Sequence, residues 1–330
     1  MDPRATAELG TTGLRVTRLG LGSAPLGGLF NPVSDADAER TVERAYELGL
    51  RFFDTAPLYG SGLAERRMGR VLRQYPRDSY VLATKAGRLI RQGAPPEPGQ
   101  HYHGAPQGME PVFDFSAEGV RTSVRESLER LGLDRVDVVH LHDPDDHYEQ
   151  ALTEGYPVLA ELRGQGAIRA VGAGMNQAPM EARFLRAAAF DCFLLAGRYT
   201  LLDQSGLDEL LPLAAERRAS IIAGGVFNSG LLAAPAPGAT YDYRPAPTHL
   251  VDRAQQLADV CRNHSVPLPA AAMQFPLGHP AVAAVVVGAR SPAELEEDVA
   301  MFETSIPAQL WEELRAGGRI PAAAPVPASR

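Results

Sequence analysis

Residues 125–145 read RESLERLGLDRVDVVHLHDPD, and they contain the two patterns from which most of the chain is built. The first part has the mixed apolar and charged spacing of an amphipathic helix, which is predicted near 116–131. The run Val136–His142 is almost continuously apolar, as is typical of a strand buried on both faces of a parallel sheet. A second helical pattern follows near 148–164. The stretch therefore predicts a helix, a buried strand and another helix in succession.

The same alternation extends in both directions along the chain. Seven further strands are predicted at Leu19–Ala24, Arg51–Ala56, Tyr80–Ala86, Ile168–Gly174, Phe190–Gly197, Ser220–Val226 and Val282–Gly288. Further helices are predicted near 35–49, 63–75, 178–188, 207–218, 249–264 and 293–304. Eight strand–helix units within ~250 residues favour a closed (β/α)8 TIM barrel. An open doubly wound sheet is the alternative, but no GxGxxG turn follows the first strand.

We predict one barrel domain over residues 1–330, with a core at about 9–305 and a C-terminal segment at 306–330. LGTTGLRVTRLG at 9–20 indicates a hairpin that plugs the bottom of the barrel. The tail AAAPVPASR is expected to be disordered.

Two long segments interrupt the repeat, at 87–115 and 227–248. Loops of this length are usually functional or disordered. We expect both loops to lie at the rim of the barrel and to form the substrate pocket together with the C-terminal segment.

The composition excludes several classes of protein. The 330 residues are 45% hydrophobic and 22% charged, which is ordinary for a globular domain with a large core. The net charge of −8 is scattered without a basic stripe, so no nucleic-acid partner is expected. No apolar run approaches the ~20 residues of a membrane span, and the N-terminus has no apolar signal region. Two cysteines cannot form a disulfide framework. We expect a cytoplasmic enzyme, and the oligomeric state stays open.

Candidate catalytic residues gather at the predicted C-terminal ends of strands, where barrel enzymes carry their active sites. Asp54 ends the second strand, Tyr59 follows it in DTAPLYG, and His142 ends the fourth strand. Lys85, near the end of the third strand, is the single lysine among 32 basic residues. A lysine retained where arginine is otherwise used indicates a role that the broad, always-charged guanidinium cannot fill.

These four side chains suit proton transfer to or from a carbonyl or hydroxyl oxygen. A phenol has a pKa near 10, and we expect the Lys85 ammonium to lower the pKa of Tyr59. Asp54 would hold the ammonium, and His142 would orient the reacting oxygen. The set contains no electron carrier, so a redox reaction needs an external cofactor. Taken singly, each residue has a structural alternative as a turn cap, packing residue, ion-pair partner or core histidine.

Several motifs resemble those of the aldo-keto reductase superfamily in the same order. They are DTAPLYG (54–60), ATKAGR (83–88), RESLERLGLDRVDVVHLHDPD, GAIRAVGAGMN (166–176) and VVVGARSPAELEEDV (285–299). The resemblance covers about residues 9–305. It implies a (β/α)8 barrel that binds NAD(P) without a Rossmann domain, and a catalytic tetrad of Asp54, Tyr59, Lys85 and His142.

The resemblance also implies cofactor contacts at the matching positions. Asn176 would hold the nicotinamide carboxamide, Gly288, Arg290 and Ser291 the phosphates, and Glu294, Glu297 and Asp298 the adenosine end. The chain departs from the usual pattern at Met175, where relatives carry serine, and at Ala196, where they carry glutamine. In NADP-using relatives an arginine grips the 2′-phosphate at the position of Glu294. NAD is therefore expected, and NADP is the less favoured cofactor.

DVVHLHDPD (137–145), LLAGRYTLLD (194–203) and GGVFNSGLLA (224–233) resemble the branch of D-threo-aldose 1-dehydrogenase, also called L-fucose or L-galactose dehydrogenase, and of pyridoxal 4-dehydrogenase. This implies oxidation of the anomeric hydroxyl of an aldose such as L-fucose, L-galactose or D-arabinose to a lactone, with hydride transfer to NAD. The hemiacetal of pyridoxal and NADPH-dependent aldehyde reduction are alternatives. A non-catalytic partner subunit that senses nicotinamide redox state is an alternative from another class.

HLHDPDDH at 140–147 also allows a metal-dependent hydrolase, since His140 and His142 alternate onto one strand face. Such a site needs ligands from other strands, and the other candidates, His249, His264 and His279, fall in helical or loop segments. No metal is therefore expected. His140 is expected to point inward beneath His142 and to hydrogen-bond an inward polar neighbour.

Overall fold

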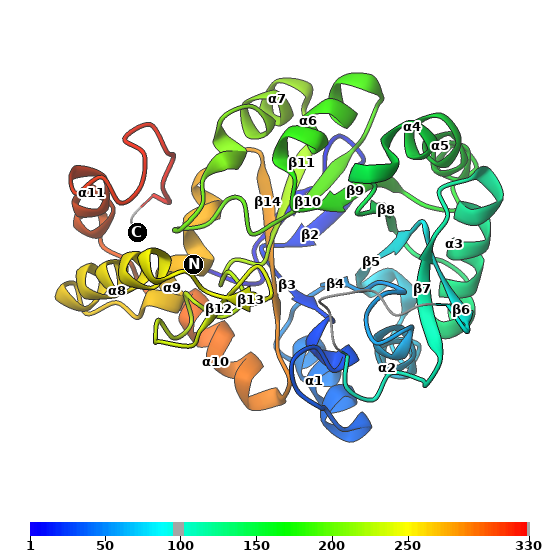
Figure 1. Ribbon diagram of the computed structural model, residues 1–330, viewed down its shortest axis with the longest axis horizontal. Helices are drawn as coiled ribbons and strands as arrows, with labels where there is room; N and C mark the ends of the chain where they lie inside the picture. Colours follow the sequence, from blue (N-terminus) through cyan, green and yellow to red (C-terminus); the bar gives the residue numbers. More distant parts are fainter. Residues whose placement is uncertain (95–101, 329–330) are drawn as a thin grey trace.

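The computed structural model describes residues 1–94 and 102–328 of the chain. Eight parallel strands close into a barrel in which the last strand pairs with the first (Figure 1). In order around the barrel they are β3 (Leu19–Gly22), β4 (Phe52–Asp54), β5 (Val81–Ala86), β8 (Val138–His142), β9 (Ala170–Met175), β10 (Cys192–Ala196), β11 (Ser220–Gly224) and β14 (Val282–Gly288). The predicted (β/α)8 barrel is confirmed, with each strand inside or within one residue of its predicted range.

Helices surround the barrel on its outside (Figure 1). They are α1 (Asp35–Glu47), α2 (Leu63–Leu72), α3 (Ala117–Leu131), α4 (Tyr148–Gln150), α5 (Tyr156–Gly164), α6 (Ala178–Ala187), α7 (Leu210–Arg217), α8 (Thr248–Asn263), α9 (Leu268–Gln274), α10 (Pro292–Glu303) and α11 (Ala308–Ala316). Capping residues determine where these helices begin and end, as α3 illustrates. The Ser116 hydroxyl accepts the amide of Gly119 at 3.0 Å, and Gly132 ends the helix with φ of 65°.

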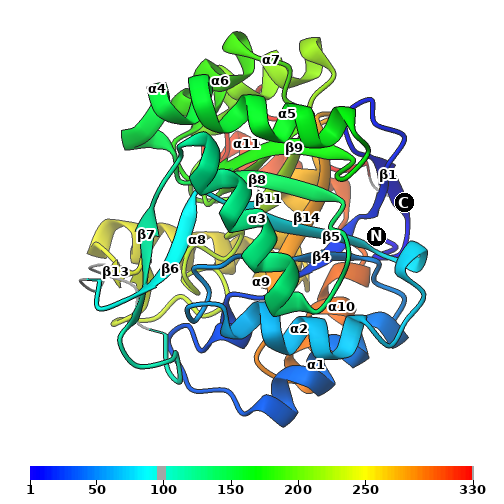
Figure 2. The same cartoon turned by 90° about the vertical axis from the view of Figure 1, so that its right-hand side faces the viewer.

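A hairpin closes the bottom of the barrel, as predicted. Strands β1 (Thr6–Glu8) and β2 (Arg15–Thr17) pair antiparallel. The side chains of Leu9, Leu14 and Val16 are buried in the same interior cluster as inward residues of the barrel strands. In Figure 2, β1 lies at one end of the barrel, whereas β13 and the β6–β7 hairpin lie at the other. The β1–β2 hairpin thus covers the first end of the barrel, and the second is called the open end below.

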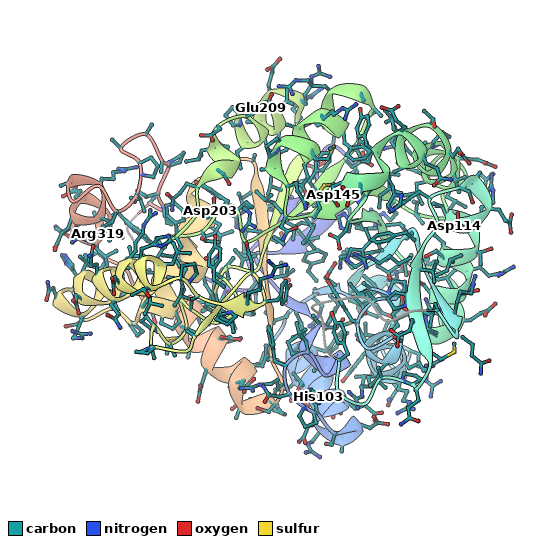
Figure 3. All side chains as sticks on the ribbon, in the orientation of Figure 1. His103, Asp114, Asp145, Asp203, Glu209 and Arg319 are labelled. Carbon is teal, nitrogen blue, oxygen red and sulfur yellow. The ribbon has the colours of Figure 1, made fainter. Side chains whose placement is uncertain are left out.

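Both long loops lie at the open end and contain short hairpins. The first carries β6 (Arg88–Gln92) paired with β7 (Met109–Phe113), and its residues 95–101 lie outside the described part of the chain. The second carries β12 (Thr240–Tyr241) paired with β13 (Arg244–Pro245). The amide of His103, labelled in Figure 3, donates to the Gly28 carbonyl at 2.9 Å, so the first loop reaches the turn after β3.

The structure corrects four expectations. α9 and α11 were not predicted, and the helix predicted near 148–164 contains a π-helical stretch at Ala151–Gly155. The tail was expected to be disordered, but its described part is packed. Ala324 is buried, and its carbonyl accepts a hydrogen bond from the Arg315 guanidinium at 2.5 Å. Because this segment packs at the end where the N-terminus lies, it does not contribute to the pocket, contrary to expectation.

Candidate active site

The structure brings Asp54, Tyr59, Lys85 and His142 together at the open end of the barrel. Lys85 Nζ donates to Asp54 Oδ2 at 2.7 Å and to Tyr59 Oη at 3.0 Å. A third bond, to the Thr55 carbonyl at 3.0 Å, uses the last ammonium proton. The rings of Tyr59 and His142 stand nearly perpendicular, with centroids 6.0 Å apart.

Strand alternation explains why these side chains converge. Lys85 and His140 are cross-strand partners on β5 and β8, and Lys85, only 1% exposed, points into the barrel. Tyr59 lies on the turn after β4, against the turn after β3. A Cβ at Gly27 would come within 2.7 Å of the Tyr59 carbonyl carbon, so only glycine allows the two turns this approach.

Burial decides the electrostatics of the Asp54–Lys85–Tyr59 cluster. Burial raises the pKa of Asp54, and the charge and hydrogen bond of Lys85 oppose that change. Burial also raises the pKa of Tyr59 well above its ordinary value, with the Asp54 carboxylate adding to the effect. The expectation that Lys85 lowers the pKa of Tyr59 is therefore wrong for this structure. The main physical reason is burial, which disfavours the charged phenolate, and the Asp54 carboxylate, 2.7 Å from Lys85 Nζ, adds to this effect.

His142 is neutral in this environment. Burial is the main cause that lowers its pKa well below the ordinary value, and the Arg88 guanidinium is the second. Its Nδ1 has no hydrogen-bond partner among the described residues. A neutral imidazole has one donor and one acceptor nitrogen, so His142 can hydrogen-bond either an alcohol or a carbonyl oxygen of a substrate.

His140 points inward one layer below His142, as predicted. Its ring is fully buried, and a Cβ at Gly172 on the adjacent strand would collide with it. The expected hydrogen bond to an inward polar side chain is absent, because neither ring nitrogen has a partner among the described residues. Burial first, and then repulsion by Lys85, lower the pKa of His140 to about 3, with the Ala173 backbone acting weakly in the opposite direction. His140 is therefore a neutral residue that fills the space left by glycine.

Sequence reasoning missed a second charged pair beside the tetrad. Arg88, buried at the start of β6, donates from Nη2 to Asp143 Oδ2 at 2.6 Å. Asp143 directly follows His142, and its Oδ2 lies 3.7 Å from His142 Nε2. The sequence did offer a signal for this pair. Arg88 and Asp143 lie close to Lys85 and His142 in the motifs ATKAGR and HLHDPD, and both are charged.

A cavity of about 480 Å³ runs from the tetrad to the N-terminus of α10. Asp54 and Tyr59 line one end, and Glu297 and Asp298 line the other. Residues of the 227–248 loop contribute to the lining as expected. In the described part of 87–115, by contrast, no residue does. Phe30 and Tyr243 also line the cavity, and their rings stack on each other with centroids 5.8 Å apart. This wall was missed because it joins two loops far apart in the sequence.

The lining fits an extended dinucleotide. Gly22, Gly224 and Gly225 leave the wall without side chains, so a ligand can approach the backbone closely. The Ser23 hydroxyl and the side-chain amide oxygen of Asn228 are buried there without a partner among the described residues. Such polar atoms are normally satisfied, which is consistent with a polar ligand in this cavity.

The structure places most of the expected cofactor residues on this cavity. Asn176, Gly288, Arg290, Glu294, Glu297 and Asp298 line it. Ser291 instead caps α10, and its hydroxyl accepts the Glu294 amide at 3.3 Å. Met175 packs in the cluster between barrel and helices, while its amide donates to the buried Glu181 carboxyl at 3.3 Å. Its side chain therefore cannot replace the serine contact of relatives.

The α10 end of the cavity is acidic. Arg290 Nε donates to Glu294 Oε1 at 2.9 Å, and the Arg290 amide donates to the other oxygen at 2.8 Å. Burial acts to raise the pKa of Glu294, but Arg290 outweighs it and the pKa is lowered. Burial first, and then the charges of Glu294 and Glu297, raise the pKa of Asp298 to about 7. An anionic group entering here would meet carboxylates and an arginine that is already paired.

Comparison with known proteins agrees with this geometry. The model of the aldo/keto reductase family matches residues 18–317. The chain belongs to the aldo/keto reductase family. It is 43% identical over 328 residues to D-threo-aldose 1-dehydrogenase of a Pseudomonas species, covering 97% of this chain and 98% of that protein. It is 44% identical over 333 residues to pyridoxal 4-dehydrogenase of Microbacterium luteolum, covering 94% and 97%.

A solved structure extends the comparison. The holo form of an aldo-keto reductase from Bacillus halodurans superposes with a TM-score of 0.75 at 27% identity, covering 94% of this chain and 95% of that one. This chain is thus an oxidoreductase of a family that uses nicotinamide cofactors. Within residues 1–94 and 102–328, no helix is long and apolar enough to cross a membrane. The same residues contain no group of three or more His, Cys, Asp or Glu side chains placed to hold a metal ion.

Proposed function

We propose that this aldo/keto reductase oxidises the anomeric hydroxyl of an aldose to a lactone, with NAD as the acceptor. The observation that carries the proposal is the Asp54–Lys85–Tyr59 hydrogen-bond chain beside His142, at one end of the dinucleotide-sized cavity. The relative named D-threo-aldose 1-dehydrogenase supports an aldose as the substrate.

A nicotinamide cofactor, held by Asn176 at the tetrad end and by the α10 residues at the other, would supply the hydride acceptor. Tyr59 takes the proton of the anomeric hydroxyl as the C1–H bond breaks, and the C1–O bond becomes the lactone carbonyl. Lys85 Nζ hydrogen-bonds the Tyr59 oxygen, whose negative charge is lost as the proton arrives, and Asp54 holds Lys85 in place. Neutral His142 donates a hydrogen bond to the reacting oxygen.

The raised pKa of Tyr59 gives this mechanism a direction in pH. Only the phenolate can accept a proton, and with a pKa raised by burial it is scarce at neutral pH. Oxidation is therefore expected to accelerate as the pH rises from 7 to 10. Reduction uses the neutral phenol and is expected to stay level or fall over the same range. A rate of oxidation that falls steadily above pH 7 would contradict this role of Tyr59.

NAD is proposed over NADP because of Glu294. Two unit charges ~4 Å apart interact by about 4 kcal/mol at an effective dielectric constant of 20, and screening at a half-exposed site reduces this to about 1–3 kcal/mol. Arg290 already offsets part of the Glu294 charge, so we expect kcat/KM to favour NAD by about 10-fold. Glu294→Arg should shift this ratio toward NADP. Equal or better use of NADP by the unaltered protein would refute the assignment.

The deciding experiment offers L-fucose, L-galactose, D-arabinose and pyridoxal to the purified protein with NAD. We expect NADH formation with at least one aldose and release of the corresponding lactone, identified by mass spectrometry. Tyr59→Phe should reduce kcat by about 10²- to 10⁴-fold while leaving binding of NAD intact. Turnover of pyridoxal alone would replace the aldose with the pyridoxal hemiacetal. Turnover of none would refute the proposal.

A further inference from the structure

Asp143 occupies an unusual position directly after the last residue of β8. Its backbone has φ of 45°, in the left-handed region, which is uncommon for residues other than glycine, although aspartate and asparagine adopt it more often than most. Such a conformation costs about 1 kcal/mol or more and is typical of functional sites. The side chain is 28% exposed, whereas its partner Arg88 is 4% exposed. A buried guanidinium therefore holds the carboxylate at the edge of the site.

The Asp143 carboxylate lies beside the proposed catalytic residue His142. Oδ2 lies 3.7 Å from His142 Nε2. Burial is the main cause that raises the pKa of Tyr59, Tyr102 and Tyr243, and the Asp143 charge adds to the effect on all three. Asp145 and the buried Glu181 are the other acidic groups that feel its charge. Arg88 is the cation bound to it, at 2.6 Å.

The chemistry of a cyclic hemiacetal limits which substrate groups can form a hydrogen bond with the Asp143 carboxylate. A substrate oxygen bound by His142 belongs to the reacting carbon, whose two ring neighbours are the ring oxygen and the next carbon. The ring oxygen only accepts hydrogen bonds, and so does a carboxylate. In an aldose the next carbon carries a hydroxyl, which can donate. Of the two groups beside the reacting carbon, the 2-hydroxyl is thus the one that can donate a hydrogen bond to Asp143.

We propose that Asp143, held by Arg88, is the specificity residue that accepts a hydrogen bond from the hydroxyl next to the reacting carbon. The inference rests on the proposed function, because it assumes that the substrate is an aldose. The residue selects 2-hydroxy substrates over their deoxy counterparts. The deoxy substrate cannot form this hydrogen bond to an ionised group. The loss corresponds to about a 10- to 100-fold lower kcat/KM.

The alternative is an ion pair that merely fastens the β6–β7 hairpin to β8. The test compares L-fucose with 2-deoxy-L-fucose in the unaltered protein and in Asp143→Gly, a change that keeps the left-handed backbone unstrained. We expect the unaltered protein to prefer L-fucose by about 10- to 100-fold and the variant to lose most of that preference. The loss should fall on L-fucose, with the deoxy sugar much less affected.

Asp191→Ala is the matched control. Asp191 accepts from Arg163 at 2.5 Å and from the Val171 amide at 2.8 Å, at the start of β10 and so at the closed end of the barrel. It should change both substrates by one common factor. The same behaviour in Asp143→Gly, or no preference in the unaltered protein, would overturn the inference.

If the unaltered protein oxidises no aldose, the proposed function fails, but Asp143 can still be tested by reduction. The pair is then 2-hydroxypropanal and propanal, with NADH or NADPH as the reductant. Preference for the hydroxy aldehyde that disappears in Asp143→Gly supports the inference. A preference that the variant retains refutes it.

Discussion

Replacing His140 with leucine should stabilise the protein, even though it removes a buried residue one layer below the active site. Neutral His140 carries one N–H donor and one lone pair, and neither has a partner among the described residues. A buried polar group without a partner costs about 1–3 kcal/mol. Leucine has a similar volume, has no polar atoms, and still faces the glycine at position 172. We therefore expect His140→Leu to raise the free energy of unfolding by about 2 kcal/mol at pH 8.

The gain should increase in acid. Between pH 6.5 and about 3 the unfolded chain binds a proton on His140 and the folded chain does not, so the unaltered protein loses stability as the pH falls. At pH 5 this amounts to about 2 kcal/mol, from 1.36 kcal/mol for each of about 1.5 pH units. The leucine variant lacks this proton uptake. Its advantage at pH 5 should therefore be about 4 kcal/mol.

Thermal unfolding at pH 8 and pH 5 measures both values. For a chain of this length 1 kcal/mol corresponds to about 1–2 °C in Tm, so the expected increases are about 3 °C and 6 °C. His279→Leu is the control, since His279 Nδ1 accepts the Ala281 amide at 3.2 Å and its loss should destabilise the protein. A destabilised His140→Leu, or an equal gain at both pH values, would refute the reasoning. An altered pH profile of turnover without a change in Tm would instead assign His140 a catalytic influence.

Three further predictions follow from the same contacts. Lys85→Arg should lower kcat by about 10²-fold or more, because the wide guanidinium cannot fill the ammonium's place beside Tyr59; near-normal turnover would make the single lysine incidental. Asp298→Asn should add about 4 kcal/mol of stability at pH 8 and almost none at pH 4, because a folded pKa of about 7 makes the unaltered protein lose stability as the pH rises from 4 to 7. Urea unfolding at both pH values checks this. Gly172→Ala should cost about 1–3 kcal/mol in urea unfolding by crowding His140 and, at 2.8 Å, the Cys192 carbonyl. The cost should be smaller in a His140→Ala background, where only the carbonyl contact remains, and equal losses in both backgrounds would contradict the contact with His140.

The barrel could be predicted from the sequence because its strands are buried on both faces and therefore read as continuous apolar runs. The residues at the strand ends then identify the rim without further information, which is why Asp54, Lys85 and His142 were found. α9 was missed for a related reason. Its sequence LPAAAMQ is apolar except for the final Gln274 and shows no helical period. The tail was missed because composition does not show which surface a segment packs against.

Other errors come from quantities that depend on three-dimensional environment. The direction of the Tyr59 pKa depends on how deeply the phenol is buried and on how far Asp54 offsets Lys85. The lack of a partner for His140 depends on which side chains face it across the barrel. Asp143 and Phe30 lie in turns whose backbone angles carry no periodic signal. The types of chemical group at the site could thus be predicted, whereas their energies could not.

The position of the single lysine also allows opening of the barrel to be measured by proteolysis. A lysine-specific protease has one bond to cut, after Lys85, and that bond lies within a central strand of the closed barrel. Cleavage of the native protein therefore requires β5 to leave the sheet, and its rate measures the population of that open form when closing is fast. Each event produces the same two fragments, 1–85 and 86–330. Lys85, which lies at the centre of the proposed chemistry, is therefore also the site at which opening of the barrel can be measured.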